Sequence, residues 1–255
     1  MGGPHGSARV VGRVEDELAR TLREPRRALN LFKPSRLRSL IHSFRGGAGG
    51  WLREGAFRRR QYGTYVGYLR HQSSKPLSSE LHTHDASLRA TLADRLKRDG
   101  VISPSMRTLC LGARLGGEVR AFLDLGCFAV GIDVNPRGAN PYVLQGDFHE
   151  LQFPRGCLDV IYTNSLDHAF DIDRVLGEVR RVLRPGGFLI VDAVKGHDEG
   201  HPPGFYEACY WRTIEDLVAL VTSDSFALQV RYEIQEPWPG EHLVFVSAPG
   251  EIRLP

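Results

Sequence analysis

The chain has 255 residues, of which 42% are hydrophobic and 25% are charged, the ordinary composition of a soluble globular protein. It contains no apolar run near the ~18 residues that a membrane-spanning helix needs, and its first residues lack the apolar core of a secretory signal. The four cysteines are widely spaced and form no C-x-x-C pair. We therefore expect reduced thiols in a cytoplasmic protein, without disulfides or a zinc site.

The net charge of +3 is unevenly distributed along the chain. Residues 1–100 contain 20 Lys/Arg and 9 Asp/Glu, a net charge of +11, whereas residues 101–255 contain 13 and 21, a net charge of −8. A basic segment favours an anionic partner, and three interpretations stay open. The segment is a lid on the acidic half of the chain, or it contacts a phosphate-bearing or lipid-linked ligand or a membrane surface through a short amphipathic helix at residues 35–45. In the third interpretation it binds nucleic acid through Arg58–Arg60, although no recognised RNA-binding module is present.

The basic half favours helices in a partly disordered extension. Expected helices cover residues 14–22, 37–44, about 51–71 and 86–97, with a flexible glycine hinge at residues 46–50. The last of these helices ends at Gly100 and leads into the acidic half. We therefore divide the chain into a basic helical extension or lid at residues 1–85 and a globular domain at residues 86–255.

Strands and helices alternate through the acidic half. Expected strands cover residues 108–112, 129–133, a third that ends at Gly146, 158–163, 188–192, 226–234 and 242–246. Helices are expected at residues 172–183 and 213–221. Only eight residues, two of them prolines, separate Asp133 from Tyr142, which is too short for a crossover helix. The expected fold class is α/β: a seven-stranded, mostly parallel sheet with helices on both faces and a closing antiparallel hairpin.

The strongest functional signal lies at residues 108–118. There an apolar strand runs into a glycine-rich turn, with Gly112 and Gly116, and then into a helix. Rossmann-like domains present backbone N–H groups to a nucleotide in this way. The next strand ends in the acid Asp133, and Arg181–Gly187, with the sequence RVLRPGG, precedes the fifth strand.

Over about residues 105–250, this series resembles the class I S-adenosylmethionine-dependent methyltransferases, specifically the small-molecule methyltransferases. The resemblance implies a Rossmann-like fold, S-adenosylmethionine as the cofactor, and transfer of its methyl group to a small-molecule acceptor. It assigns the cofactor to the carboxyl ends of the strands. The residues expected to bind the cofactor are Gly112, Ala113, Arg114, Gly116, Asp133, Val134, Gly146, Asp147, Phe148 and Asn164.

Two acids are central to that assignment. Asp133 would accept hydrogen bonds from the ribose hydroxyls, and the alternative is a solvated acid at a strand end. Asp147 would meet the adenine amino group while the ring of Phe148 packs on the base, and the alternative is a helix N-cap. Asn164 would shape the pocket beside the transferred methyl group.

The glycine-rich turn departs from the family pattern at two positions. The family usually has an acid where Cys110 stands and a glycine where Arg114 stands. Arg114 would hold the methionine carboxylate of the cofactor in a charge-assisted contact. The alternatives are that Arg114 points to solvent or blocks the turn, and a blocked turn would leave a catalytically silent subunit that binds a partner.

The expected general base is His168, because imidazole titrates near neutral pH and the residue follows the fourth strand. The alternative is a structural histidine. Tyr62, Tyr65, His197 and Tyr206 would hold the acceptor, and plain core packing is the alternative for Tyr62 and Tyr65.

A magnesium-dependent variant of the reaction would use Asp167 and Asp192 as ligands. Ala193 replaces the asparagine expected in such enzymes, so we expect no metal. The functional prediction is O-methylation of a small-molecule hydroxyl. The alternatives are an RNA methyltransferase that uses the basic arm and the silent subunit. A dehydrogenase is disfavoured because the turn matches G-x-G-x-x-G poorly.

Overall fold

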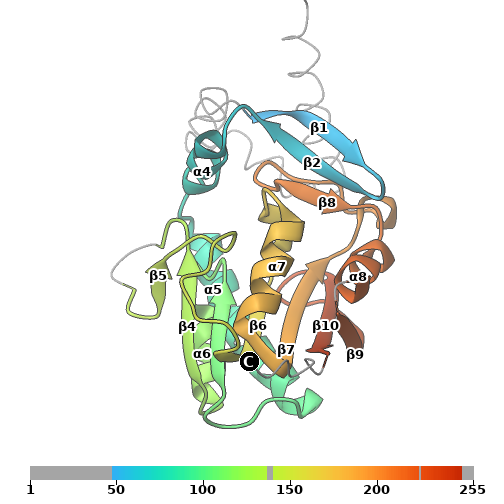
Figure 1. The fold of residues 1–255 in the computed structure, drawn as a ribbon. Coiled ribbons are helices and arrows are strands. Elements are labelled where there is room, and N and C mark those ends of the chain that lie inside the picture. Colours follow the sequence, from blue (N-terminus) through green and yellow to red (C-terminus); the bar gives the residue numbers. More distant parts are fainter. Residues whose placement is uncertain (1–47, 137–139, 224, 249–255) are drawn as a thin grey trace, which may run out of the picture. The chain divides into compact units, whose positions relative to one another are not determined.

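The computed structural model (Figure 1) describes residues 48–136, 140–223 and 225–248. These residues form two compact units. Unit 1 comprises the described residues up to Pro76 together with Asp167–Phe170 and Lys195–Asp216. Unit 2 comprises Leu77–Leu166, Asp171–Val194 and the described residues from Leu217 onward.

Part of the predicted basic extension lies outside the described residues. This applies to the helices expected at residues 14–22 and 37–44 and to the amphipathic segment at residues 35–45. The division of the chain after residue 85 stays a prediction.

Unit 2 is built on a seven-stranded sheet with the order β5-β4-β3-β6-β7-β10-β9. The first five strands in this order are parallel, and β10 and β9 close the sheet with antiparallel pairing. The strands are β3 (Arg107–Leu111), β4 (Phe128–Asp133), β5 (Val143–Gln145), β6 (Leu158–Thr163), β7 (Leu183–Val194), β9 (Phe226–Ile234) and β10 (Gly240–Ser247). The predicted α/β fold is confirmed. The largest difference is β7, which begins before residue 188 because Leu183 already pairs with Leu158.

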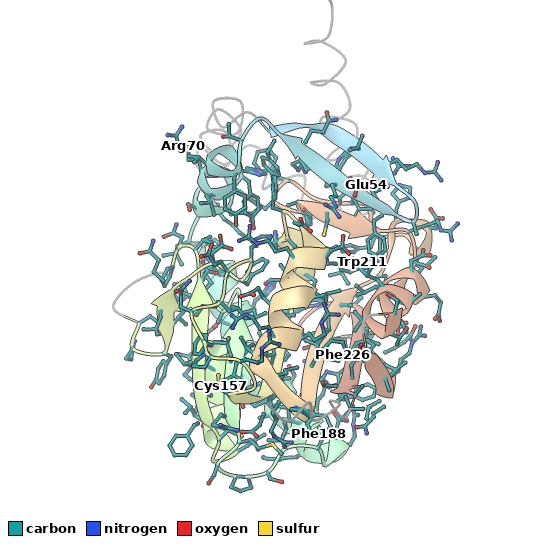
Figure 2. All side chains as sticks on the ribbon, in the orientation of Figure 1. Glu54, Arg70, Cys157, Phe188, Trp211 and Phe226 are labelled. Atoms are coloured by element: carbon teal, nitrogen blue, oxygen red, sulfur yellow. The ribbon has the colours of Figure 1, made fainter. Side chains whose placement is uncertain are left out.

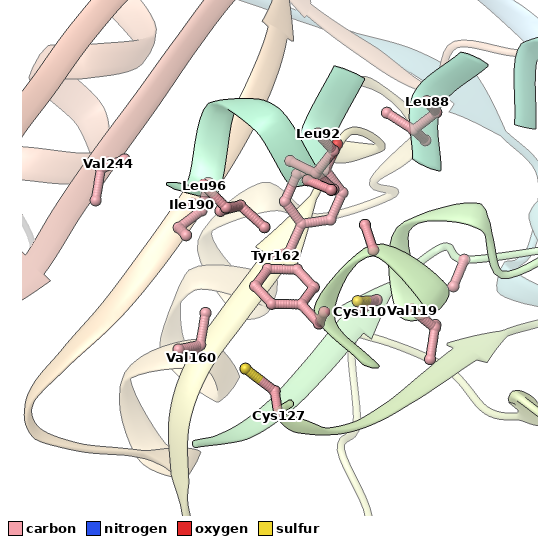
Figure 3. Packing of buried hydrophobic residues seen from close by; sticks show 14 of the residues in the cluster. Leu88, Leu92, Leu96, Cys110, Val119, Cys127, Val160, Tyr162, Ile190 and Val244 are labelled. Atoms are coloured by element: carbon pink, nitrogen blue, oxygen red, sulfur yellow. The ribbon is translucent and has the colours of Figure 1, made fainter. Parts of the chain in front are cut away.

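Helices cover both faces of this sheet. They are α5 (Ser79–Asp99), α6 (Gly117–Asp124), α7 (Ile172–Val182) and α8 (Ile214–Ser223). Figure 3 shows one face, where Leu88, Leu92 and Leu96 of α5, spaced four residues apart, pack over Cys110, Tyr162 and Ile190 of three strands. The next residue before each of these strand positions points to the other face and is also fully buried: Leu109, Ile161 and Leu189.

α5 begins seven residues before the predicted start at residue 86. The Ser78 side chain caps it by accepting a hydrogen bond from the Leu81 N–H at 3.2 Å. Leu81 is the only large apolar residue in its first two turns, so the apolar spacing that predicts a helix starts only at Leu88. The predicted end is confirmed, with Gly100 in the left-handed conformation at φ 68°.

The connection between β4 and β5 contains no helix in its described residues, 134–136 and 140–142, as its length predicts. β5 is the edge strand of the sheet, and Leu144 within it is 57% exposed. This flank therefore carries apolar surface that a crossover helix would otherwise cover.

Unit 1 contains a three-stranded antiparallel sheet and one helix. The elements are β1 (Ala48–Glu54), β2 (Phe57–Tyr62), β8 (Cys209–Trp211) and α4 (Tyr65–Ser73). The helix predicted over residues 51–71 is therefore wrong for its first half, and the predicted glycine hinge is strand from residue 48 onward. Figure 2 shows Glu54 at the end of β1 and Trp211 in β8.

Gly55 and Thr64 explain this difference. Gly55 takes a left-handed conformation, φ +58°, which allows a two-residue turn between the paired residues Glu54 and Phe57. Thr64 then starts α4, since its side chain accepts a hydrogen bond from the Gly67 N–H at 3.0 Å. These local signals outweigh the helical spacing of the aromatic residues.

All four cysteines are free thiols. Cys110, Cys127 and Cys209 are buried and Cys157 is half-buried. No helix in the described part of the chain is long and apolar enough to cross a membrane.

Candidate functional site

The expected cofactor residues lie at one edge of the sheet in unit 2. Leu111 pairs with both Ile132 and Thr163, and Asp133 pairs with Gln145. Four adjacent parallel strands therefore end at the same level. The residues that follow or end them are Gly112 to Gly116, Asp133 and Val134, Gly146 to Phe148, and Asn164.

Gly112 controls how closely two of these strand ends approach. It has a φ of +72°, and a Cβ added there would lie 2.7 Å from both Cβ and Oγ of Ser165. The Ser165 hydroxyl donates to Oδ1 of Asn164 at 2.9 Å. The turn after β3 thus meets the residues after β6 with no room for a side chain.

Arg114, within the glycine-rich turn, adopts a backbone conformation that is typical of glycine. Arg114 has a φ of +31°, a conformation that residues with a Cβ rarely adopt. Gly116 follows at φ +82°, and its N–H donates to the Ala113 carbonyl at 2.6 Å. The departure at Arg114 has therefore changed the side chain and kept the shape of the turn.

Asn140 supports this turn and was missed by sequence reasoning. Its Nδ2 donates to the Leu115 carbonyl at 3.0 Å, and its Oδ1 accepts from the Tyr142 N–H at 2.9 Å. The length of the β4–β5 connection predicts that it contains no helix. Nothing in its sequence indicates that the side-chain amide of Asn140 binds the glycine-rich turn.

Asp85 is a second residue that the sequence did not reveal. From α5 its carboxylate accepts a hydrogen bond from the Gly117 N–H at 2.7 Å and pairs with Arg120. Added atoms at Gly117 would collide with the Asp85 backbone. The first turn of α6 is therefore held by α5, next to the glycine-rich turn.

The next residue of that helix turn, Glu118, is a buried acid. Its exposed fraction is 3%. Burial raises its pKa to about 8, and the nearby carboxylates of Asp85 and Asp133 add to the effect. Burial likewise raises the pKa of the Cys110 thiol, with a smaller contribution from the charge of Glu118.

The two acids assigned to the nucleoside make local contacts. Asp133 is half-buried and accepts a hydrogen bond from the Asn135 N–H at 2.7 Å. Asp147 accepts from the N–H of His149 at 2.9 Å and contacts the Nδ1 of that ring at 2.8 Å. No helix starts at Asp147, so the helix N-cap alternative is wrong; the residue stabilises a turn. Phe148 is buried and its ring stacks on His149, with centroids 4.8 Å apart.

The expected base lies in unit 1, in the 3-10 turn Leu166–His168. Nδ1 of His168 is 2.9 Å from the Tyr206 carbonyl, and Nε2 is 3.3 Å from Nζ of Lys75. The His168 carbonyl accepts from the Tyr68 hydroxyl at 3.1 Å. Because a carbonyl only accepts hydrogen bonds, Nδ1 carries the proton and Nε2 carries the lone pair.

Aromatic residues gather in the same unit. Tyr62, Tyr65 and Tyr68 contact the Phe170 ring at centroid distances of 6.0, 5.2 and 5.3 Å. This cluster includes two of the predicted acceptor residues and also satisfies the core-packing alternative, since Tyr68 is fully buried.

Tyr206 belongs to the same unit, and His197 makes different contacts. The Tyr206 ring stacks on His71, with centroids 5.3 Å apart, and His71 in turn contacts the Tyr62 hydroxyl at 2.8 Å. The exposed His197 lies against Asp198 at 3.0 Å and faces the Tyr210 ring instead.

A family model described as a methyltransferase domain matches residues 109–191. This range begins in β3, ends in β7 and contains every strand end of the cofactor site. The chain carries a class I S-adenosylmethionine-dependent methyltransferase domain. The cofactor of this domain is S-adenosylmethionine.

Curated relatives of the methyltransferase domain are sterol methyltransferases by name. The sterol 4-C-methyltransferase strm-1 of Caenorhabditis elegans is 27% identical over 128 residues, which cover 44% of this chain and 37% of that protein. The sterol 24-C-methyltransferase ERG6B of Gibberella zeae is 30% identical over 104 residues, which cover 34% and 27%. The chain thus matches about a third of the length of these relatives.

Two solved structures share the fold. A SAM-dependent methyltransferase from Aquifex aeolicus has a TM-score of 0.52 and 15% identity, covering 68% of this chain and 98% of its own. The [4+2]-cyclase SpnF has a TM-score of 0.51 and 19% identity, covering 63% and 82%. At these identities the similarity concerns the fold alone, and the same fold carries more than one reaction.

Arg60 is not available to nucleic acid in the methyltransferase, contrary to one of the interpretations of Arg58–Arg60. It is 6% exposed, and its guanidinium donates to the carbonyls of Glu207 and Gly204 at 2.8 and 2.9 Å. It also lies over the Trp51 ring, 4.4 Å from the centroid. The residue stabilises unit 1.

Asp192, considered above as a magnesium ligand, has a structural role in the methyltransferase. Its carboxylate accepts hydrogen bonds from Arg95 at 2.5 Å, from the Tyr162 hydroxyl at 2.7 Å and from Nδ1 of His242 at 2.5 Å. This network links α5 to three strands of the sheet. No group of three potential metal ligands occurs among the described residues.

Proposed function

We propose that this methyltransferase transfers the methyl group of S-adenosylmethionine to a hydroxyl group of a small-molecule acceptor. The observation that carries the proposal is the orientation of His168. Its Nδ1–H is bound to the Tyr206 carbonyl, so Nε2 holds the lone pair that accepts a proton.

The strand ends of unit 2 fit the cofactor. Gly112 and Gly116 let the backbone of the turn approach a ligand closely. Asp133 would accept hydrogen bonds from the ribose, Asp147 would accept one from the adenine amino group, and Arg114 would hold the methionine carboxylate. When bound, the cofactor supplies a methyl carbon activated by its positive sulfur.

His168 would take the proton of the acceptor hydroxyl, so that the hydroxyl oxygen could accept the methyl group that the bound cofactor would supply. The Asp167 carboxylate, 3.9 Å from Nε2, stabilises the imidazolium that results. In the free protein the Lys75 ammonium contacts the same nitrogen, so the acceptor hydroxyl has to displace it.

The rings of Tyr62, Tyr65 and Tyr206 favour a planar or apolar acceptor. Because all four cysteines are free thiols, we also propose that the enzyme works in a reducing compartment, the cytoplasm.

Replacing the base tests the proposal. We expect His168→Gln to lower methyl transfer from labelled S-adenosylmethionine to a panel of hydroxylated aromatic acceptors by about 10²- to 10⁴-fold, with unchanged cofactor affinity. His82→Gln, at an exposed position of α5, is the control. Unchanged turnover of His168→Gln would contradict the role of this residue.

A carbon acceptor is the second candidate, because the two curated relatives are named sterol C-methyltransferases. The family model covers residues 109–191, so the segments 48–76 and 195–216 of unit 1 lie outside it. Sterols belong in the same acceptor panel. A product methylated on carbon would replace the O-methylation proposal and leave the cofactor site intact.

A further inference from the structure

Glu118 is a buried acid that forms no ion pair with any residue in the described part of the chain. It occupies the first turn of α6, two residues after Gly116 of the cofactor turn. Apart from its own backbone amide, no described residue forms a hydrogen bond or ion pair with its carboxylate. Burying a carboxylate without such a partner is unfavourable, so the free protein holds this group protonated near neutral pH.

Arg120, the described cation whose charge acts on Glu118, is already engaged. Arg120, on the same helix, is paired with Asp85, whose carboxylate also holds the Gly117 N–H. The other titratable groups that influence Glu118 or feel its charge come from three strands, and none is cationic: Cys110 of β3, Asp133 of β4 and Tyr162 of β6. Glu118 is therefore an acid next to the cofactor turn that has no ion-pair partner of its own among the described residues.

S-adenosylmethionine carries such a cation, since its methionine part ends in an ammonium group beside the carboxylate. We infer that Glu118 binds the ammonium group of the cofactor and that cofactor binding releases the proton which Glu118 holds in the free protein. The proton passes to solvent and the resulting carboxylate pairs with the ammonium; no other bond changes. This inference rests on the proposed cofactor site at the strand ends.

Binding of the ammonium group by Glu118 explains how the turn can bind the cofactor although it has Cys110 where the family usually has an acid. The carboxylate comes from the helix that follows the turn instead of from the strand that precedes it. The thiol of Cys110 is buried at the strand position, and the charge of Glu118 acts on it.

Calorimetric titration at pH 7 in two buffers of different ionisation enthalpy tests this inference, because the difference in heat counts the protons released. A group with a pKa of about 8 is about 0.9 protonated at pH 7. We expect Glu118→Gln to release ~0.9 fewer protons than the wild type when it binds S-adenosylmethionine, and to bind it about tenfold more weakly. Binding of the ammonium form takes up a smaller fraction of a proton, because an α-amino group with a pKa of about 7.7–8.0 is already mostly protonated at pH 7.

5′-Methylthioadenosine is the matched ligand, since it keeps the nucleoside and lacks the ammonium group. Both proteins should bind it with equal affinity and without the extra proton, which also verifies that the variant is folded. Equal proton release by wild type and Glu118→Gln with S-adenosylmethionine would overturn the inference.

If the variant does not fold, the wild type alone tests the inference. Equal proton release by the wild type on binding S-adenosylmethionine and 5′-methylthioadenosine would also overturn it. Equal proton release in either comparison would overturn the inference about Glu118 without contradicting the proposed cofactor site. Failure of the wild type to bind either ligand would instead overturn the proposed function, and the inference with it.

Discussion

Gly112 illustrates how a single residue sets the distance between two strand ends. It combines a left-handed backbone with a contact to Ser165 that leaves no room for a Cβ. Gly156 has a similar φ, +64°, but the nearest atom to an added Cβ is 4.0 Å away. A substitution at Gly156 therefore measures the free-energy cost of the backbone conformation alone, whereas a substitution at Gly112 adds the cost of the steric collision.

We expect Gly156→Ala to lose about 1 kcal/mol of unfolding free energy, from the backbone conformation alone, and to bind S-adenosylmethionine normally. Gly112→Ala should lose more and should also weaken cofactor binding, because the turn has to move away from Ser165. Denaturant unfolding and calorimetry measure the two effects. Equal stability losses and equal affinities for the two variants would show that the contact with Ser165 is unimportant.

The residues predicted from the sequence share one property, which is their position at the end of an apolar run. Asp133 and Asn164 could be placed because parallel strands end at a common edge. Asn140 and Asp85 could not, because each acts through a contact between elements distant in sequence, and Glu118 could not, because its burial depends on how α6 packs. Their spacing carries no periodic signal, and only the packed structure reveals what they touch.

Among the elements, long apolar or closing segments were predictable and the polar or turn-rich ones were not. β6 agrees with its predicted range because all six of its residues are buried, and β9 follows its alternation, whereas the first six residues of β10 are all buried. The β1–β2 hairpin was not predicted, because Gly55 and the neighbouring run of arginines do not match the sequence pattern that is typical of paired strands. The first turns of α5 were not predicted because Leu81 is the only large apolar residue in them and shows no helical spacing by itself.

Ser78 gives a direct test of where α5 begins. If the helix starts at Ser79, Ser78→Ala removes the cap on the Leu81 N–H and should lower the unfolding free energy by about 1 kcal/mol. Ser79→Ala, one position later, should change it by less than ~0.5 kcal/mol. A neutral Ser78→Ala in denaturant unfolding would favour the later start near residue 86.

At the scale of the whole molecule, unit 2 depends on a buried charge network around Asp192. Burial alone raises the pKa of this carboxyl, but the hydrogen bond and charge of His242, together with Arg95, lower it overall. Burial alone lowers the pKa of His242, but its contacts with Asp192 and Asp99 raise it overall. The lowered pKa of Asp192 contributes stability above the unfolded value of ~3.9, lost as the pH falls through the folded value.

The stabilising contribution of His242 depends on pH in the opposite direction. Its stabilising contribution is complete below the unfolded pKa of ~6.5 and is lost as the pH rises through the raised folded value. We expect His242→Gln to cost about 3–5 kcal/mol near pH 6, with a difference from the wild type that shrinks as the pH rises. Unfolding curves from pH 5 to 10, with His82→Gln as control, measure it. A difference that stays constant with pH would contradict the charged state of His242.

The account depends most directly on the cofactor site at the strand ends of unit 2. Calorimetric titration of the wild type, Asp133→Ala and the surface control Asp124→Ala with S-adenosylmethionine and S-adenosylhomocysteine tests it. We predict micromolar binding by the wild type and Asp124→Ala, and its loss in Asp133→Ala. A well-folded wild type that binds neither compound would contradict the account and would favour the catalytically silent subunit.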